Sequence, residues 1–128
     1  MLNHQTLLEA SNIAIYYNFV DDWIYVKWMG NSSVEEIKAG AEKILYFMKA
    51  QRCSKVLNDH SLRTGIWSES IDWIEKDWLP RMEAAGLKMM ALVYPLDRYS
   101  QLSTDKAVAQ ITTNISFLTF HNIETAKD

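Results

Sequence analysis

The segment LKMMALVY, residues 87–94, is a nearly unbroken apolar run that Pro95 ends. An apolar run of this length, bounded by a proline, is typical of a β-strand whose two faces are both covered. Strands of this kind occur inside parallel sheets that have helices packed on them. We therefore predict that residues 87–94 form a central strand of a sheet.

Helices are predicted both before and after this strand in the sequence. Ser68 is a suitable N-cap for a helix that Gly86 closes, in the position typical of a C′ glycine. Pro80 lies inside this helix, removes one backbone hydrogen bond and is expected to bend the helix. The chain continues with a helix, a strand and a helical stub, predicted over residues 103–111, residues 115–120 and from residue 122 onward.

The N-terminal half begins with a predicted antiparallel hairpin. Apolar and polar side chains alternate over residues 13–19, which is the period of a strand with one buried face. Aromatic and β-branched residues dominate residues 23–29, and Asp21 and Asp22 lie in the intervening turn. The two strands are therefore expected to pair with each other.

A helix and a third strand follow the hairpin. Ser33 and Glu36 have the spacing of a capping box, so a helix with one apolar face is predicted to begin there. A short strand is predicted at residues 55–59. Because strands that alternate with helices favour parallel pairing, we predict one α/β domain over residues 1–128. Its mixed sheet of about five strands would carry an N-terminal antiparallel hairpin, with helices packed on the sheet.

Charge and composition exclude several classes of function. The net charge is −3 and the 13 basic residues are scattered, so no surface for nucleic acid is expected. No segment approaches the roughly 20 apolar residues of a membrane helix. Cys53 is the single cysteine, which excludes a disulfide within the chain, and the three histidines lack metal-binding spacing. We expect a cytoplasmic protein that holds no metal or cofactor.

Short motifs along most of the chain resemble one known family. They are residues 55–59 (KVLND), Trp67, Trp73, residues 78–80 (WLP), 85–88 (AGLK), 101–103 (QLS) and 120–127 (FHNIETAK). Together with the order of elements, they resemble STAS-type domains, specifically the SpoIIAA-like STAS/SEC14-type group of small bacterial proteins. The resemblance implies a single STAS-like domain that acts as a non-enzymatic regulatory or ligand-binding module.

The segment from Asn58 to Trp67 is the predicted functional site. We expect it to be a loop at the carboxyl end of a parallel strand, where open α/β sheets place their ligand sites. Trp67 and Trp73 are expected either to add contact area at this site or to pack internally. The side chains predicted to bind a protein partner or a small apolar ligand are Asn58, Asp59, His60, Arg63, Thr64, Trp67 and Trp73.

The resemblance also implies an alternative, a phosphorylation-controlled switch in this segment. In the anti-sigma-factor antagonists of the superfamily, a serine or threonine in an Asp-Ser-Ser-Gly-like turn is phosphorylated. Thr64 and Gly65 match the end of such a turn, whereas Arg63 replaces the small hydroxyl residue and the connection is longer. Thr64 and Ser61 are the candidate phosphosites of this alternative.

Two further alternatives stay open. A small hydrolase or isomerase would use Asp59 to orient His60 as a base, although adjacent residues of an extended strand point to opposite faces. A symmetric homodimer would use the exposed hairpin face that carries Trp23 and Tyr25.

Overall fold

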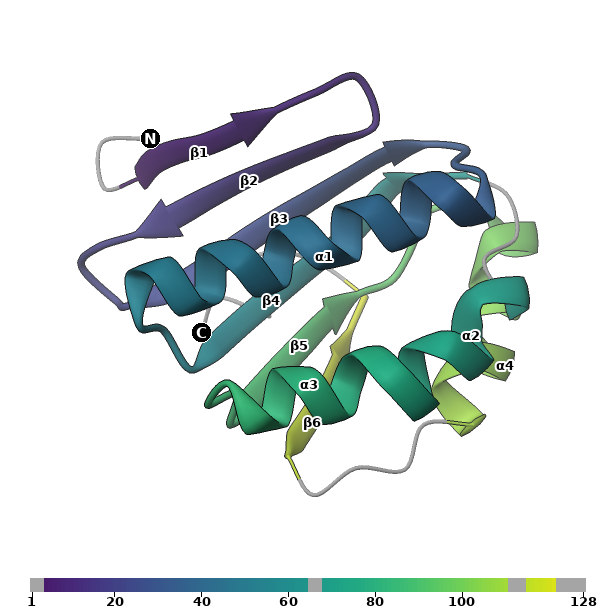
Figure 1. Cartoon of the computed structure of the whole chain (residues 1–128). Coiled ribbons are helices and arrows are strands. Elements are labelled where there is room, and N and C mark those ends of the chain that lie inside the picture. Colours follow the sequence, from purple (N-terminus) through teal and green to yellow (C-terminus); the bar gives the residue numbers. More distant parts are fainter. Residues whose placement is uncertain (1–3, 65–67, 111–114, 122–128) are drawn as a thin grey trace.

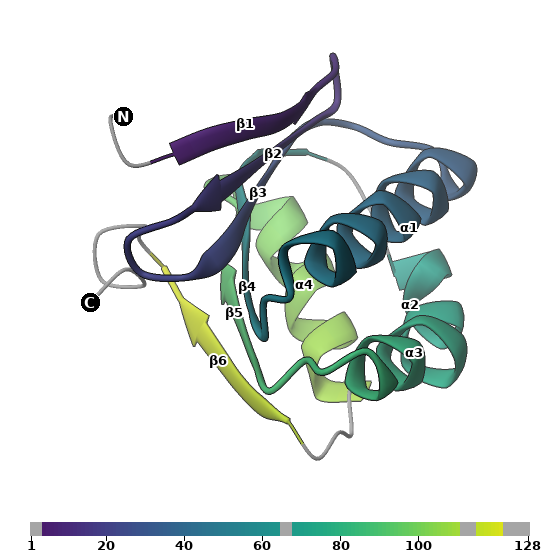
Figure 2. The same cartoon turned by 60° about the vertical axis from the view of Figure 1, so that its left-hand side comes forward.

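The computed structural model describes residues 4–64, 68–110 and 115–121. The strands form one six-stranded sheet in the order β1-β2-β3-β4-β5-β6, and the helices lie on one side of it (Figure 1 and Figure 2). Strands β1, β2 and β3 pair antiparallel, whereas β3, β4, β5 and β6 pair parallel. The bounds of the strands are β1 His4–Glu9, β2 Ile13–Asn18, β3 Trp23–Gly30, β4 Lys55–Arg63, β5 Met89–Val93 and β6 Ser116–Phe120.

The helices form the connections between the parallel strands. Helix α1 connects β3 to β4, a run of four helical pieces connects β4 to β5, and α4 lies between β5 and β6. None of the helices in the described part of the chain is long and apolar enough to cross a membrane. Their bounds are α1 Val34–Gln51, η1 Ser68–Ser70, α2 Ile71–Trp73, the π-helical turn η2 Ile74–Trp78, α3 Leu79–Ala84 and α4 Arg98–Gln110.

The mixed α/β class and the N-terminal antiparallel pairing are confirmed, but the sheet has six strands rather than about five. The additional strand is β1, which pairs with β2 and has a register shift between Thr6 and Leu8. Because of this irregularity, the consecutive residues Leu7 and Leu8 both pack against the core. The alternation of apolar and polar residues that marks a strand is therefore interrupted.

The prediction that β4 ends at Asp59 is wrong, because the strand continues to Arg63. The ladder with β3 extends through the pairs Met29–Leu62 and Gly30–Arg63, after a register shift. The segment that begins at Asn58 was predicted to be a loop because it is polar. Its first six residues lie instead inside the sheet, where their backbone groups are satisfied by the neighbouring strands.

Helix α1 begins as predicted, with Ser33 as its N-cap. The Ser33 Oγ accepts a hydrogen bond from the Glu36 N–H at 3.1 Å, and the Glu36 Oε1 accepts one from the Ser33 N–H at 2.9 Å. Gly40 lies where α1 approaches the sheet most closely. A Cβ atom at this position would lie 2.6 Å from Cη2 of Trp28, so the helix can approach the sheet to this distance only with glycine at position 40.

The predicted helix that ends at Gly86 is present as the run from η1 to α3. Pro80 is the second residue of α3, and the π-helical turn η2 directly precedes α3, with the Leu79 N–H bonded to the Ile74 carbonyl. A π-turn shifts the pattern of backbone hydrogen bonds just before Pro80, whose nitrogen has no hydrogen to donate. Gly86 has a φ of +111° and completes a C-terminal cap, in which the Leu87 N–H bonds to the Met82 carbonyl.

The C-terminal elements differ from the prediction in their bounds. Helix α4 begins at Arg98 rather than at Ser103, because the Asp97 carboxylate accepts a hydrogen bond from the Ser100 N–H at 2.9 Å and caps the first turn. Strand β5 covers residues 89–93 of the predicted 87–94, and it lies between β4 and the edge strand β6 rather than at the centre of the sheet. The predicted end of this helix at residue 111 and the stub from residue 122 lie outside the described residues.

The two faces of the sheet are buried differently. The large core lies between the sheet and the helices, and it includes Ala107 of α4 as well as residues of α1 and α3. A small cluster lies on the opposite face and consists of Tyr25, Leu57, Ala91 and Val93. The expectation that the hairpin exposes Tyr25 is wrong, because this side chain is buried in its own chain.

Candidate functional site

A cavity of about 50 Å³ lies between the sheet and the helices. Its walls are mostly apolar, because they are formed by the inner faces of α1, of the run from η2 to α3, and of β5 and β6. Strand β4 adds its polar residues. The apolar residues of the wall include Ile37, Ala41, Ile44, Ile74, Leu79, Met90, Leu92 and Phe117, and the polar residues are Asn58, His60 and Arg63.

Asn58 connects two apolar residues of the cavity wall through its amide. Its Oδ1 accepts a hydrogen bond from Nε1 of Trp28 at 3.1 Å, and its Nδ2 lies 3.5 Å from Sδ of Met90. The indole bond fixes the orientation of the amide. A thioether sulfur is a weak acceptor, so the amide N–H groups are bound less tightly than the oxygen.

His60 is buried at the polar end of the cavity. Its ring centroid lies 6.3 Å from that of Trp28. Burial holds the pKa of His60 well below its usual value of 6.5, and the positive charge of Arg63 lowers this pKa further. The imidazole is therefore neutral at physiological pH.

Arg63 brings a positive charge into this apolar environment. Its side chain is only 2% exposed, and its Cζ lies 5.6 Å from the centroid of the Trp28 ring. Burial lowers the pKa of Arg63 to about 10, which leaves the guanidinium protonated at neutral pH. Arg63 shares a face with His60 although three positions separate them, because the register shift between β3 and β4 interrupts the alternation.

Asp59 faces the other side of the sheet and is separated from His60. The Tyr25 hydroxyl donates a hydrogen bond to Oδ2 of Asp59 at 2.5 Å, and the Ser61 N–H donates one to Oδ1 at 2.9 Å. Burial, followed by this bond to Asp59, raises the pKa of Tyr25. The structure therefore does not form the relay from Asp59 to His60 that a hydrolase or isomerase would need.

The remaining predicted site residues lie apart from the cavity. Thr64 is exposed after the end of β4, and Ser61 is partly buried. Trp73 is partly buried, with the Nζ of Lys38 and the Cζ of Arg81 at 5.6 Å and 5.9 Å from its ring. Trp67 lies outside the described residues. The structure thus brings together Asn58, His60 and Arg63 from the predicted set.

Trp28 is the main residue of this site that the sequence did not identify. It contacts all three polar residues of the cavity, through a hydrogen bond to Asn58 and through its ring with His60 and Arg63. Its position, two residues after Val26 and four after Ile24, places it on the inner face of the hairpin strand. This alternation was the available signal, but it indicates burial and gives no information about the neighbours on β4.

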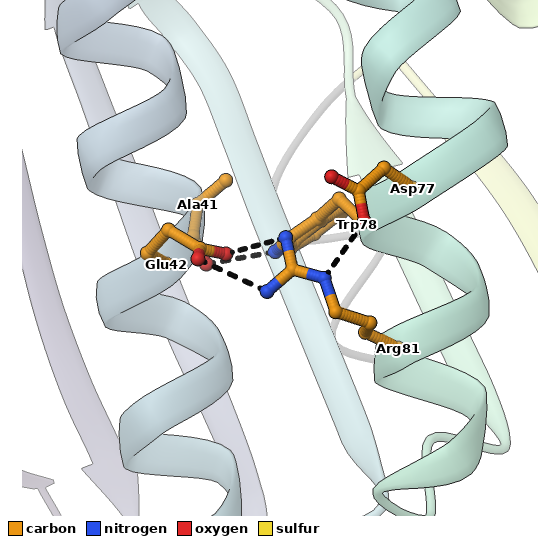
Figure 3. Close-up of polar contacts among 5 residues, drawn as sticks. All are labelled: Ala41, Glu42, Asp77, Trp78 and Arg81. Carbon is orange, nitrogen blue, oxygen red and sulfur yellow. Dashed lines mark hydrogen bonds and ion pairs between the residues drawn. The ribbon is translucent and has the colours of Figure 1, made fainter.

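A polar clasp on the surface joins the two helical elements that cover the cavity (Figure 3). The guanidinium of Arg81 forms two bonds to the Glu42 carboxylate, at 2.8 and 3.0 Å, and one to Asp77 at 3.0 Å. Below the clasp, Nε1 of Trp78 donates a hydrogen bond to the Ala41 carbonyl at 2.8 Å. These bonds fix the spacing between α1 and the helical run.

The residues give little basis for a metal centre. Among residues 4–64, 68–110 and 115–121, no group of three or more His, Cys, Asp or Glu side chains could hold a metal ion. The one described cysteine, Cys53, is buried, and burial raises the pKa of its thiol.

No model of a known protein family matches the chain, and no curated protein sequence matches it. Solved structures do match. The anti-sigma factor antagonist SpoIIAA in its unphosphorylated form aligns over 98% of this chain and 94% of its own, with 13% identity and a TM-score of 0.52. The chain has a SpoIIAA-like fold.

Two further solved structures match the chain along most of its length. An uncharacterised DUF3478 family protein from Shewanella loihica, with a SpoIIAA-like fold, aligns over 97% of this chain and 98% of its own, with 17% identity and a TM-score of 0.53. SiaC of Pseudomonas aeruginosa aligns over 90% of this chain and 95% of its own, with 11% identity and a TM-score of 0.50. The resemblance found in the short motifs is confirmed at the level of the fold.

Proposed function

We propose that this protein is a regulatory module that binds a protein partner at the carboxyl edge of its parallel strands. The surface would be formed by the end of β4, the start of the helical run and the start of α4. Open α/β sheets place their binding sites at this edge. The SpoIIAA structure supports the proposal, because an anti-sigma factor antagonist is a regulatory protein with the same fold.

Exposed leucines at this edge are the observation that carries the proposal. Leu62, Leu96 and Leu102 are 48%, 69% and 51% exposed. Leu62 is the penultimate residue of β4 and Leu96 lies three residues after the end of β5, so both are near the carboxyl ends of neighbouring strands. Exposed apolar side chains that gather at one edge are typical of a surface that a partner covers.

The predicted binding residues divide between this surface and the cavity. Thr64 is exposed at the edge and is available to a partner. Asn58, Asp59, His60 and Arg63 are buried, so we assign no direct partner contact to them. Trp73 lies on the adjacent helical surface, where Lys38 and Arg81 surround its ring.

The test replaces exposed leucines by aspartate and follows one captured partner. Leu62→Asp and Leu96→Asp should each abolish capture of the protein that the unaltered chain retains from cells of its source. Val20→Asp is the matched control, because Val20 is 60% exposed in the turn between β2 and β3, at the opposite end of the sheet. Equal capture by all three variants, each with unchanged circular dichroism, would contradict the proposal.

A phosphorylation-controlled switch is the second candidate, because Thr64 is an exposed residue with a hydroxyl group at the same edge. A phosphate there would add nearly two negative charges to the proposed surface. The buried Arg63 guanidinium lines the cavity, so it is not placed to receive this phosphate on the surface. Intact mass of the protein from its source cells, compared with Thr64→Ala and Ser61→Ala, would reveal the modification; no added mass in any growth phase would contradict this candidate.

A further inference from the structure

The cavity between the sheet and the helices has a cationic end and an apolar end. Arg63 and His60 lie toward the carboxyl end of β4. Met90 and Phe117 form a ladder pair near the start of β5 and β6, toward the opposite end of the parallel strands. A molecule in this cavity would therefore meet a positive charge at one end and hydrocarbon at the other.

We propose that this cavity is a binding site for a short-chain carboxylate of two or three carbon atoms, with its carboxylate toward Arg63 and its hydrocarbon chain toward Met90 and Phe117. The proposal goes beyond partner binding, because the residues of the cavity are buried and those of the proposed partner surface are exposed.

Charge determines the polar end of the ligand. A guanidinium that is 2% exposed interacts strongly with an anion, because the surrounding side chains screen charge far less than water does. Its planar fork of donors matches a carboxylate better than a spherical ion.

The amide of Asn58 disfavours a cationic ligand. Its Nδ2 lies 3.5 Å from Sδ of Met90, and a thioether is a poor acceptor. The amide cannot turn over to present its oxygen, because the Trp28 indole holds Oδ1 at 3.1 Å. The cavity therefore offers donors to the ligand, which favours an anion over a cation.

The volume determines the length of the ligand. A water molecule needs about 10–15 Å³ of such space, so a cavity of about 50 Å³ has room for roughly three to five groups of this size. Acetate and propionate have four and five non-hydrogen atoms, whereas butyrate has six and exceeds this room. Inorganic phosphate is of similar size, but it would place oxygens against the apolar walls without partners.

The experiment follows the indole N–H of Trp28 in ¹⁵N-labelled protein as propionate is added at constant pH and ionic strength. Trp28→Phe identifies the resonance. Propionate should shift it saturably, with half-saturation at about 10 mM or below. Propionamide, which has the same shape without the charge, should bind at least about tenfold more weakly. Hexanoate and inorganic phosphate should cause no saturable shift.

Two arginine variants complete the test. Arg63→Met removes the charge from the cavity and should weaken propionate binding at least about tenfold. Arg98→Met removes the same charge from the exposed start of α4 and should leave binding unchanged within about twofold. If Arg63→Met fails to fold, the comparison of propionate with propionamide on the unaltered chain decides. Equal binding of the acid and the amide, or no saturable shift with propionate, would overturn the proposal.

Discussion

His60 and Arg63 occupy the same buried environment, and the charge of Arg63 makes a positive charge on His60 less favourable. Burial is the larger cause of the low pKa of His60, and Arg63 adds to it. In the unfolded chain, His60 returns to a pKa near 6.5. Between the two values, the unfolded state binds more protons than the folded state, so acid favours unfolding.

We therefore expect the free energy of unfolding to be constant above about pH 7 and to fall as the pH decreases through 6.5. The loss from His60 can be at most about 1.4 kcal/mol for each pH unit below 6.5, because it arises from a single proton. Urea unfolding of the native chain and of His60→Gln at several pH values measures this contribution of His60 to the free energy of unfolding. If the two proteins show the same pH dependence, the burial of a neutral His60 is not the cause of the lost stability in acid.

The residues of the cavity show how far sequence reasoning extends at this scale. Asn58, His60 and Arg63 were predicted to belong to one site, and they do line one cavity. Their burial was not predictable, because polar residues next to an apolar strand usually indicate a loop. The inward direction of Arg63 depends on a register shift that involves β3, which the sequence of β4 alone does not contain.

At the scale of elements, local signals were reliable where one segment contains the whole interaction. The capping box of α1 and the glycine after α3 are both formed within a few residues, and both were predicted at the correct positions. Strands β1 and β4 depend on pairing with distant segments, and there the prediction missed a strand or ended it too early. Pairing partners override local polarity.

The start of α1 gives a matched pair of substitutions. Ser33→Ala removes the side-chain acceptor of the capping box and should lower the free energy of unfolding by about 1 kcal/mol. Ser32 is its neighbour and is buried, and its Oγ has no hydrogen-bond partner among the described residues. Ser32→Ala should therefore be neutral or slightly stabilising. Thermal denaturation compares the two variants; an equal loss in both would show that the cap does not stabilise the helix.

At the scale of the whole molecule, the cavity depends on how closely α1 packs on the sheet. Gly40 permits this distance, and the Arg81 clasp fixes the spacing of α1 from the helical run. The exposed carboxyl edge and the buried cavity are separate regions of one SpoIIAA-like scaffold. The fold was predictable from the order of elements, whereas the cavity was not, because it arises where side chains of α1, the helical run and the sheet, distant in sequence, pack together.

Gly40→Ala tests this packing. Alanine favours a helix over glycine by about 1 kcal/mol, but its Cβ would lie 2.6 Å from the Trp28 ring and force the helix or the ring to move. We expect a net loss of about 1 to 2 kcal/mol, since overpacking a core usually costs more than the gain in propensity. In a Trp28→Phe background the same substitution should cost less, because the smaller ring leaves room. Equal costs in both backgrounds, measured by urea unfolding, would contradict the close contact.

The irregular pairing of β1 has a consequence for the chain in concentrated solution. An edge strand exposes unpaired backbone groups that can recruit a strand from another molecule. A bulge between Thr6 and Leu8 twists this edge and disturbs the regular spacing that such recruitment needs. The irregularity that hid β1 from sequence-based prediction thus also protects the protein against edge-to-edge aggregation.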